Sequence, residues 1–352
     1  MIGLRGPQRS GRRLASAALL LALPGCMATG SLARVSPGSL LLVASASSSP
    51  DSGQLSWHRP GTGRIDGSCV AAPVPTALTV TRDGERAVVS GPGIDELEVI
   101  NLFTELRHAR IELPASPVAA AMLDRRTSAL VTAGRQVLRV QLYTGSEPEI
   151  VLGGLRSPSG LAWSPDLERA HVVAGSSELI SFDLEGEILG RTPLPAGARH
   201  ILRHPASGQL WIPCPDAGEV AVVDEQTLEI RSARLGGTPV SLSFAGTSDA
   251  AVVSDASSTR LRRIHMESLE VLDSIELGPL ADEADPTPGV VRVEPAGRYA
   301  FAALPHAGLV AVVDLEAGGV TGVIQTRGTP TAIAWTRLRR RMGRAGDPGW
   351  RD

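Results

Sequence analysis

The chain has 352 residues, of which 43% are hydrophobic and 20% are charged, and its formal net charge is −3 at pH 7. Nucleic-acid-binding proteins present a basic face, and single-strand binders also stack bases on aromatic side chains. The slightly acidic balance and the scarcity of aromatic residues (five Trp, four Phe and two Tyr) therefore argue against nucleic acid as a partner.

Residues 1–25 are predicted to be a signal peptide. They begin with the basic segment MIGLRGPQRSGRR and continue with an apolar run over 14–23. A membrane-spanning helix needs about 20 apolar residues, so this run is too short to span and fits the hydrophobic region of an export signal. The paired Arg12 and Arg13 leave open whether export uses the general or the twin-arginine route.

The end of this segment resembles the lipobox of bacterial lipoproteins. Leu23-Pro24-Gly25-Cys26 stands where that motif places a Cys that is lipid-modified and becomes the first residue of the mature chain. The resemblance implies lipidation of Cys26 and attachment to the cell envelope, facing the periplasm. Met27 follows instead of Asp, which favours the outer membrane if the source has two. The alternative is an ordinary cleaved signal with a Cys26 that carries no lipid.

Residues 26–37 are predicted to be a short tether, and residues 38–336 repeat one unit. VPTALTVTRDGERAVVS (74–90) recurs as SPVAAAMLDRRTSALVT (116–132), as SPSGLAWSPDLERAHVV (157–173) and in more divergent copies. The middle apolar residue of the first strand in each unit is Leu78, Ala120, Leu161, Ile201, Leu242, Val291 or Ile333, at spacings of 40 to 49 residues. A period near 42 is typical of propeller blades. The longest spacing contains the acidic insertion 280–288.

Each unit predicts four short strands. In the first complete unit we expect them at about 77–81, 87–90, 97–100 and 109–113, with turn residues such as Asp83-Gly84 between them. Short runs of apolar and β-branched residues fit strands, and no stretch shows a persuasive helical period.

The two ends of the repeat region are expected to meet in one blade. Segment 39–47 (SLLLVASAS) matches the second strand of a unit that lacks its first, and 329–335 (TPTAIAW) matches a first strand. Pairing them would remove exposed sheet edges. The predicted fold class is therefore all-β: a seven-bladed β-propeller of four-stranded antiparallel blades, closed by pairing of the N- and C-terminal segments.

The repeat resembles YVTN-type β-propellers of the lactonase-like group. EVINLFTELRHARIEL (98–113) and VAVVDEQTLEIRSARL (220–235) carry the resemblance, which covers roughly residues 38–336. The four-residue motif that names the family is degraded here to VVSG, LVTA and VVAG, without its Asn. The resemblance therefore implies the fold and no shared site.

The expected binding site is one mouth of the propeller channel. Loops after the second and fourth strands of each antiparallel blade lie on the same face and encircle this mouth. The candidate ligand-binding residues there are Arg199, His200, Asp216, Asp255, His306 and Arg327. Charges of both signs converge without an obvious catalytic pairing, and solvated loop residues are the alternative. No catalytic residue, cofactor or metal site is predicted.

One histidine pair and one ring of residues are further candidates for a site. His200 and His204 lie four apart, which on a strand is about 13 Å, too far to share a metal ion. The equivalent position of the innermost strands holds Val80, Met122, Trp163, Arg203, Phe244, Val293 and Trp335. Packing between blades is expected there, except at Arg203, because a charge is rarely buried unpaired. The sequence names no partner for Arg203.

Cysteines and the C-terminal tail give weaker predictions. Cys69 and Cys214 fall on nearly opposite repeats, so we expect two separate thiols although export would permit a disulfide. The Arg-rich tail, 337–352, is predicted to be disordered. Contact with anionic lipid near the anchor is the alternative.

Two functions from different classes fit these features. The first is a membrane-anchored envelope propeller that acts as a binding or protein-interaction scaffold, with a protein or small molecule on one face. The second is a lactonase-like hydrolase that uses charged residues at the channel mouth. Electron-transfer partnering with a redox enzyme rests on fold analogy alone.

Overall fold

The computed structural model describes residues 39–47, 52–143, 145–244, 246, 249–278 and 285–337. The predicted signal peptide, the predicted tether (26–37) with Cys26, and residue 38 lie outside these ranges. So do most of the acidic insertion and the tail beyond residue 337. The described residues form 28 β-strands and no α-helix. Within them there is accordingly no helix with the length and hydropathy needed to cross a bilayer.

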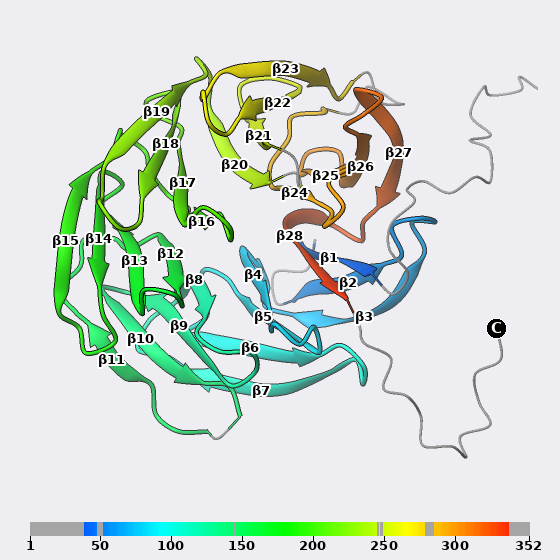
Figure 1. Ribbon diagram of the computed structural model, residues 1–352. Helices are drawn as coiled ribbons and strands as arrows, with labels where there is room; N and C mark the ends of the chain where they lie inside the picture. The colour runs from blue at the N-terminus through cyan, green and yellow to red at the C-terminus, as the bar shows by residue number, and fades with distance from the viewer. Residues whose placement is uncertain are drawn as a thin grey trace, which may run out of the picture. The chain divides into compact units, whose positions relative to one another are not determined.

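The strands form seven four-stranded antiparallel sheets, which are the blades of a ring (Figure 1). From the innermost to the outermost strand, the first three blades are β28 (Thr329–Arg337), β1 (Ser39–Ala46), β2 (Gly53–His58), β3 (Ile65–Ala71); β4 (Ala77–Val80), β5 (Arg86–Ser90), β6 (Glu96–Asn101), β7 (Leu106–Glu112); and β8 (Pro117–Met122), β9 (Ser128–Ala133), β10 (Gln136–Gln141), β11 (Glu149–Leu152). The fourth and fifth are β12 (Gly160–Ser164), β13 (Arg169–Ala174), β14 (Glu178–Phe182), β15 (Ile188–Pro193); and β16 (Leu202–Arg203), β17 (Gln209–Cys214), β18 (Glu219–Asp224), β19 (Ile230–Arg234). The last two are β20 (Pro239–Phe244), β21 (Ala250–Asp255), β22 (Arg260–His265), β23 (Val271–Glu276); and β24 (Val291–Val293), β25 (Tyr299–Leu304), β26 (Leu309–Asp314), β27 (Gly319–Gln325).

The first blade joins the two ends of the described chain, as predicted. β28 pairs antiparallel with β1 from Ser39↔Arg337 to Ala46↔Thr329, with a bulge at Ala44. Figure 1 shows the red C-terminal strand beside the blue N-terminal one. The Thr331 hydroxyl adds a 3.1 Å hydrogen bond to the carbonyl of Ala44. The seam of the ring is thus closed by backbone pairing, which leaves no open sheet edge there.

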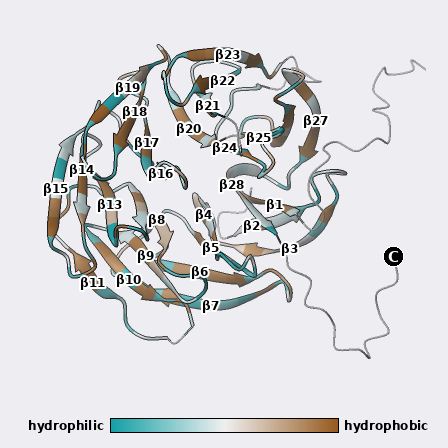
Figure 2. Cartoon of the chain, viewed as in Figure 1, coloured by the Kyte–Doolittle hydropathy of each residue, from teal (hydrophilic) through white to brown (hydrophobic). Residues whose placement is uncertain are grey.

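The core lies between blades. In β5, Ala87 and Val89 pack against the first blade, whereas Val88 packs against the third. Both faces of a middle strand are therefore covered, so these strands are almost continuously apolar. The outermost strand β7 alternates between exposed and partly buried residues along most of its length. Figure 2 shows the contrast, with more hydrophilic colour on β7 than on β6.

Short polar side chains fix the turns after the third strands. Asp224 Oδ1 accepts hydrogen bonds from the backbone N–H groups of Gln226 (2.8 Å) and Thr227 (2.9 Å). Asn101 and Asp314 bond their own turns in the same way. Asn and Asp favour such turns because their side chains mimic a backbone acceptor. This explains why Asn or Asp recurs there in the repeat.

The strand register confirms the repeat alignment. Val80, Met122, Trp163, Arg203, Phe244, Val293 and Trp335 each lie opposite the corresponding residue of the second strand in their own blade. The apolar members pack into the clusters between blades, as expected. One detail differs, because β16 contains only Leu202–Arg203 and its anchor Ile201 lies just outside the strand.

Candidate functional site

A cavity of about 600 Å³ lies along the innermost strands, and all seven blades contribute to its wall. Most lining residues are small or aliphatic. The polar side chains that line it are those of Thr76, Thr79, Arg82, Ser90, His200, Arg203, Ser241, Arg292 and Thr331. No described lining residue is an Asp or Glu. The cavity is therefore a channel with cationic groups and an otherwise nearly neutral wall.

His200 lies two residues before β16 and is open to the cavity. Burial lowers the pKa of His200 to about 4, and the nearby charges of Arg292 and Arg199 act in the same direction. A Cβ built on Gly160 would come within 3.0 Å of His200 Cα, so the glycine lets β12 approach this residue. His200 is thus a neutral hydrogen-bonding group near pH 7.

Arg292 in β24 is the second cavity-lining residue of interest. Its Nη1 donates to the carbonyl oxygen of Val291 at 2.8 Å and lies 3.5 Å from both Ser241 Oγ and the carbonyl oxygen of Leu242. Its Nε and Nη2 make no hydrogen bond, and its guanidinium no ion pair, to any residue that the structure describes. Burial lowers the pKa of Arg292 to about 10, which still leaves it charged at pH 7.

Arg203 in β16 has the partner that the sequence did not name. Its Nε donates to Glu225 Oε2 at 2.7 Å and its Nη2 to Oε1 at 2.8 Å. Nη2 also lies 3.0 Å from Asp166 Oδ2. The Arg203 and Glu225 side chains are only 13% and 6% exposed, whereas Asp166 is 73% exposed. Arg203 is therefore neutralised within the protein by a paired, mostly buried carboxylate.

Asp255, a predicted mouth residue, is engaged in its own blade. Its Oδ1 accepts from the Thr238 N–H and from the N–H and hydroxyl of Ser257, and its Oδ2 lies 2.8 Å from Arg262 Nη2. Burial raises the pKa of Asp255, but the hydrogen bonds and the charge of Arg262 outweigh it, and the net shift is downward. The carboxylate holds together the loop before β20, the turn after β21 and the middle of β22.

Other predicted mouth residues lie apart from the cavity wall. Asp216 follows β17 and packs so closely on Gly197 that a Cβ there would come 2.6 Å from the Asp216 nitrogen. His306 follows β25 and is exposed, and Arg327 is exposed between β27 and β28. Arg199 is also exposed, beside His200. Of the predicted candidates, His200 alone lines the cavity, with Arg199 next to it.

Arg292 was missed by sequence reasoning, although a signal for it existed. It pairs with Phe301, at the register position where Thr79 pairs with Val88 in the second blade. The same position in the other blades holds Ala121, Ala162, Leu202, Ser243 and Ala334. Among these described residues, Arg292 is the one charged residue at a position that is otherwise small, polar or aliphatic, and this is the signal for the site. The ring that contains Arg203 and Val293 is the neighbouring position, one residue later in each strand.

His204 serves its own turn. Its Nδ1 accepts from the Ser207 N–H at 3.1 Å, within the loop between β16 and β17. This local bond agrees with the view that its spacing from His200 is coincidental. Across the described ranges, no group of three or more His, Cys, Asp or Glu side chains is placed to hold a metal ion.

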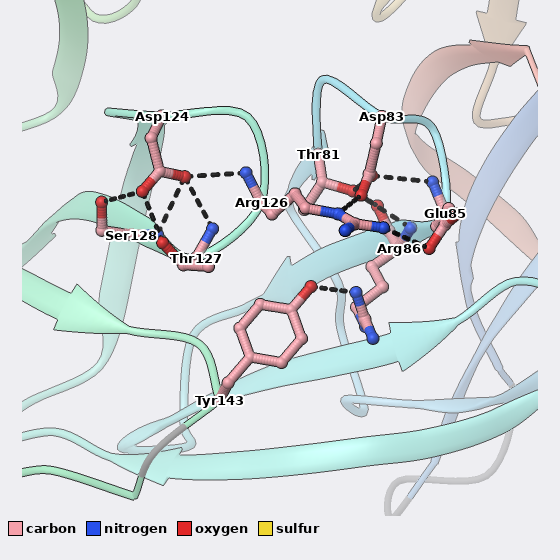
Figure 3. Close-up of polar contacts among 9 residues, drawn as sticks. All are labelled: Thr81, Asp83, Glu85, Arg86, Asp124, Arg126, Thr127, Ser128 and Tyr143. Atoms are coloured by element: carbon pink, nitrogen blue, oxygen red, sulfur yellow. Dashed lines mark hydrogen bonds and ion pairs between the residues drawn. The ribbon is translucent and has the colours of Figure 1, made fainter.

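The loops after the first and third strands, on the opposite face, carry an inter-blade polar network (Figure 3). Arg126, after β8, lies 2.6 Å from Asp83 Oδ2 and 3.2 Å from Glu85 Oε2, both after β4. Arg86 donates to the Tyr143 hydroxyl, and its guanidinium carbon lies 4.2 Å from the centre of that ring. These contacts join the second blade to the third. Arg126 is paired with two carboxylates and Arg86 packs on Tyr143, which is a structural role.

Both described cysteines are free thiols, as expected. Burial raises the pKa of Cys69 to about 12 and that of Cys214 to about 11. A thiol with so high a pKa has almost no thiolate at neutral pH, so neither is a reactive nucleophile.

Many solved structures share the fold, among them the following three. The β-propeller domain of Cps50 (Swd1) from Myceliophteria thermophila matches with a TM-score of 0.65 at 11% identity, over 80% of this chain and 98% of that one. Hydrazine synthase from Kuenenia stuttgartiensis gives 0.63 at 14% identity, over 77% and 94%. AztD from Citrobacter koseri gives 0.58 at 12% identity, over 85% and 97%. Such low identity shows the β-propeller fold alone. No family model and no curated protein sequence matches the chain.

Proposed function

We propose that the chain is an exported, lipid-anchored propeller of the YVTN type that binds a ligand in its channel and does not transform it. The observation that carries this proposal is the cavity of about 600 Å³ walled by all seven blades. Cavities of roughly 300–1,000 Å³ are typical of small-molecule sites. The ring itself is closed by strand pairing, so the wall is a preformed surface.

The anchor is supported by the lipobox-like Leu23-Pro24-Gly25-Cys26. Expression of the full chain and of its Cys26→Ala variant, followed by separation of membrane and soluble fractions, tests it. The wild-type protein is expected in the membrane fraction and the variant in the soluble fraction. Cys69→Ala is the matched control and should stay membrane-bound. Equal membrane retention of the Cys26→Ala variant would contradict the anchor.

The hydrolase alternative has no observation in its favour, since Asp255 is fully engaged and His306 lies off the cavity wall. It is tested by incubating the Cys26→Ala protein with a panel of lactones, with and without divalent metal. No turnover is expected. Turnover that Asp255→Ala or His306→Ala abolishes would replace the binding function with catalysis at the channel mouth.

A further inference from the structure

We propose that the channel cavity binds a small oxyanion, a molecule bearing a carboxylate or phosphate group, through the guanidinium of Arg292, with His200 and Ser241 as neutral hydrogen-bonding partners. The inference deepens the proposed binding function and rests on it, because it names the chemical class of ligand for the same cavity.

The first argument is the unfilled edge of the Arg292 guanidinium. Nη1 alone is used, by Val291 and weakly by Ser241 and Leu242. Nε and Nη2 form the edge that matches the two oxygens of a carboxylate or phosphate. Arg203 shows the same edge filled, because its Nε and Nη2 hold the two oxygens of Glu225 at 2.7 and 2.8 Å. Arg292 offers an external anion the geometry that Arg203 offers Glu225.

The second argument is the charge of the wall. Arg292 and Arg82 line the cavity, Arg203 is neutralised by Glu225, and no Asp or Glu is among the described lining residues. A cationic group inside a protein channel attracts anions more strongly than one on an open surface, because the surrounding protein screens its field less than water does. Burying a charge without a counter-ion is unfavourable, so a bound anion would relieve that cost at Arg292.

The third argument is the surroundings of the guanidinium. Ser241 Oγ lies 3.5 Å from Nη1, and Arg292 is close enough to His200 to contribute to its lowered pKa. Neutral His200 can donate one hydrogen bond to an anion without adding charge. The remaining wall near these groups is apolar, for example Leu161, Ile201 and Leu242. This combination fits a small organic acid or phosphate ester whose polar end faces Arg292.

Titration calorimetry of the full-length protein, in a chloride-poor buffer at pH 7, tests the inference. Inorganic phosphate and succinate are titrated separately, so the two arms distinguish a phosphate from a carboxylate ligand. At least one probe is expected to bind the wild-type protein. Arg292→Gln should weaken that binding by about tenfold or more. Arg327→Gln, which removes an exposed arginine outside the cavity wall, should leave the dissociation constant unchanged.

Arg292→Lys is a second variant that separates charge from geometry. It keeps the positive charge but loses the two-pronged edge, so it should bind more weakly than wild type and more tightly than Arg292→Gln. The inference is overturned if neither probe binds the wild type below about 10 mM. It is also overturned if Arg292→Gln, folded by circular dichroism, binds like Arg327→Gln. The latter result would leave the binding function standing, whereas lactone turnover would remove that function without touching the anion site.

Discussion

β16 and β24 each carry an arginine that lines the central cavity, and the two differ in what fills their guanidinium edge. Arg203 holds Glu225 in a paired contact, with Asp166 beside it. Arg292 has no carboxylate partner in the described chain. Their strands are also the two shortest among the described ones, with two and three residues. The difference teaches that an arginine in the inner ring is structural where its blade supplies an acid and available for a ligand where it does not.

The largest expected effect is on the pH dependence of stability. It arises from His171, whose pKa is influenced by the charges of Arg203 and Glu225. His171 in β13 is fully buried, with Nδ1 2.8 Å from Ser181 Oγ. Burial lowers the pKa of His171 to about 4, the charge of Glu225 opposes this shift, and those of Arg169 and Arg203 add to it. Between pH 6.5 and 4 the unfolded chain binds a proton that the folded chain does not, so stability falls as pH falls. The loss is about 3 kcal/mol.

Urea denaturation of wild type and His171→Gln at pH 7 and pH 4 measures this contribution. The variant should lose less stability on acidification than wild type does. His306→Gln, which removes an exposed histidine, is the control and should follow wild type. Identical pH dependence of wild type and His171→Gln would show that His171 has the same pKa in the folded and unfolded chains, which would contradict the lowered pKa.

The next effect tests whether the Glu225 contact is essential to Arg203. Glu225→Gln leaves a mostly buried guanidinium with only the exposed Asp166, and should lower the free energy of unfolding by about 2 kcal/mol. Asp166→Asn, which removes the exposed member of the same cluster, should change it by less than about 0.5 kcal/mol. Urea denaturation at pH 7 compares the two. Equal losses of stability would mean that Asp166 neutralises Arg203 as well as Glu225 does. The buried carboxylate would then not be what distinguishes Arg203 from Arg292.

A third change gives Arg292 in β24 an internal carboxylate partner, as Arg203 in β16 has in Glu225. Ser241→Asp places a carboxylate beside Arg292 Nη1, and its oxygens can still accept the Val291 N–H that Ser241 Oγ accepts at 3.3 Å. Pairing the charge should raise stability by about 1 kcal/mol. It should also abolish phosphate and succinate binding, because the internal carboxylate occupies the cation. Anion binding with wild-type affinity would contradict the conclusion that an internal carboxylate makes this arginine unavailable to a ligand.

The smallest effect is expected from removing the unpaired arginine. Arg292→Met should change the free energy of unfolding by less than about 0.5 kcal/mol, because the lost hydrogen bonds are offset by relief of an unpaired charge. Thermal and urea unfolding measure it, with Arg203→Met as the destabilised counterpart. A loss above about 2 kcal/mol for Arg292→Met would indicate that Arg292 has an internal counter-ion, so that it would not differ from Arg203.

Most of the fold could be predicted from the sequence, because each blade repeats the same local pattern. The repeat spacing gave seven units, and the unmatched 39–47 and 329–335 gave the closing pair that β1 and β28 form. The site residues are harder to predict, because the repeat pattern tells on which face a loop lies but not where its side chains point. Asp255 turned inward to Arg262, and His306 stayed at the surface. Which side chains line the common cavity depends on how the seven blades pack around it. The alternation of loops between the two faces does not contain that information.

The seam has a mechanical consequence. Ser39 and Arg337 are paired at the same end of the β1–β28 ladder, and both chain ends leave from there. A force that pulls the two ends apart would load this ladder one pair at a time, as a zipper opens, instead of shearing all its hydrogen bonds together. Tension applied through the termini is therefore expected to open the ring at the first blade at low force, before any other blade yields.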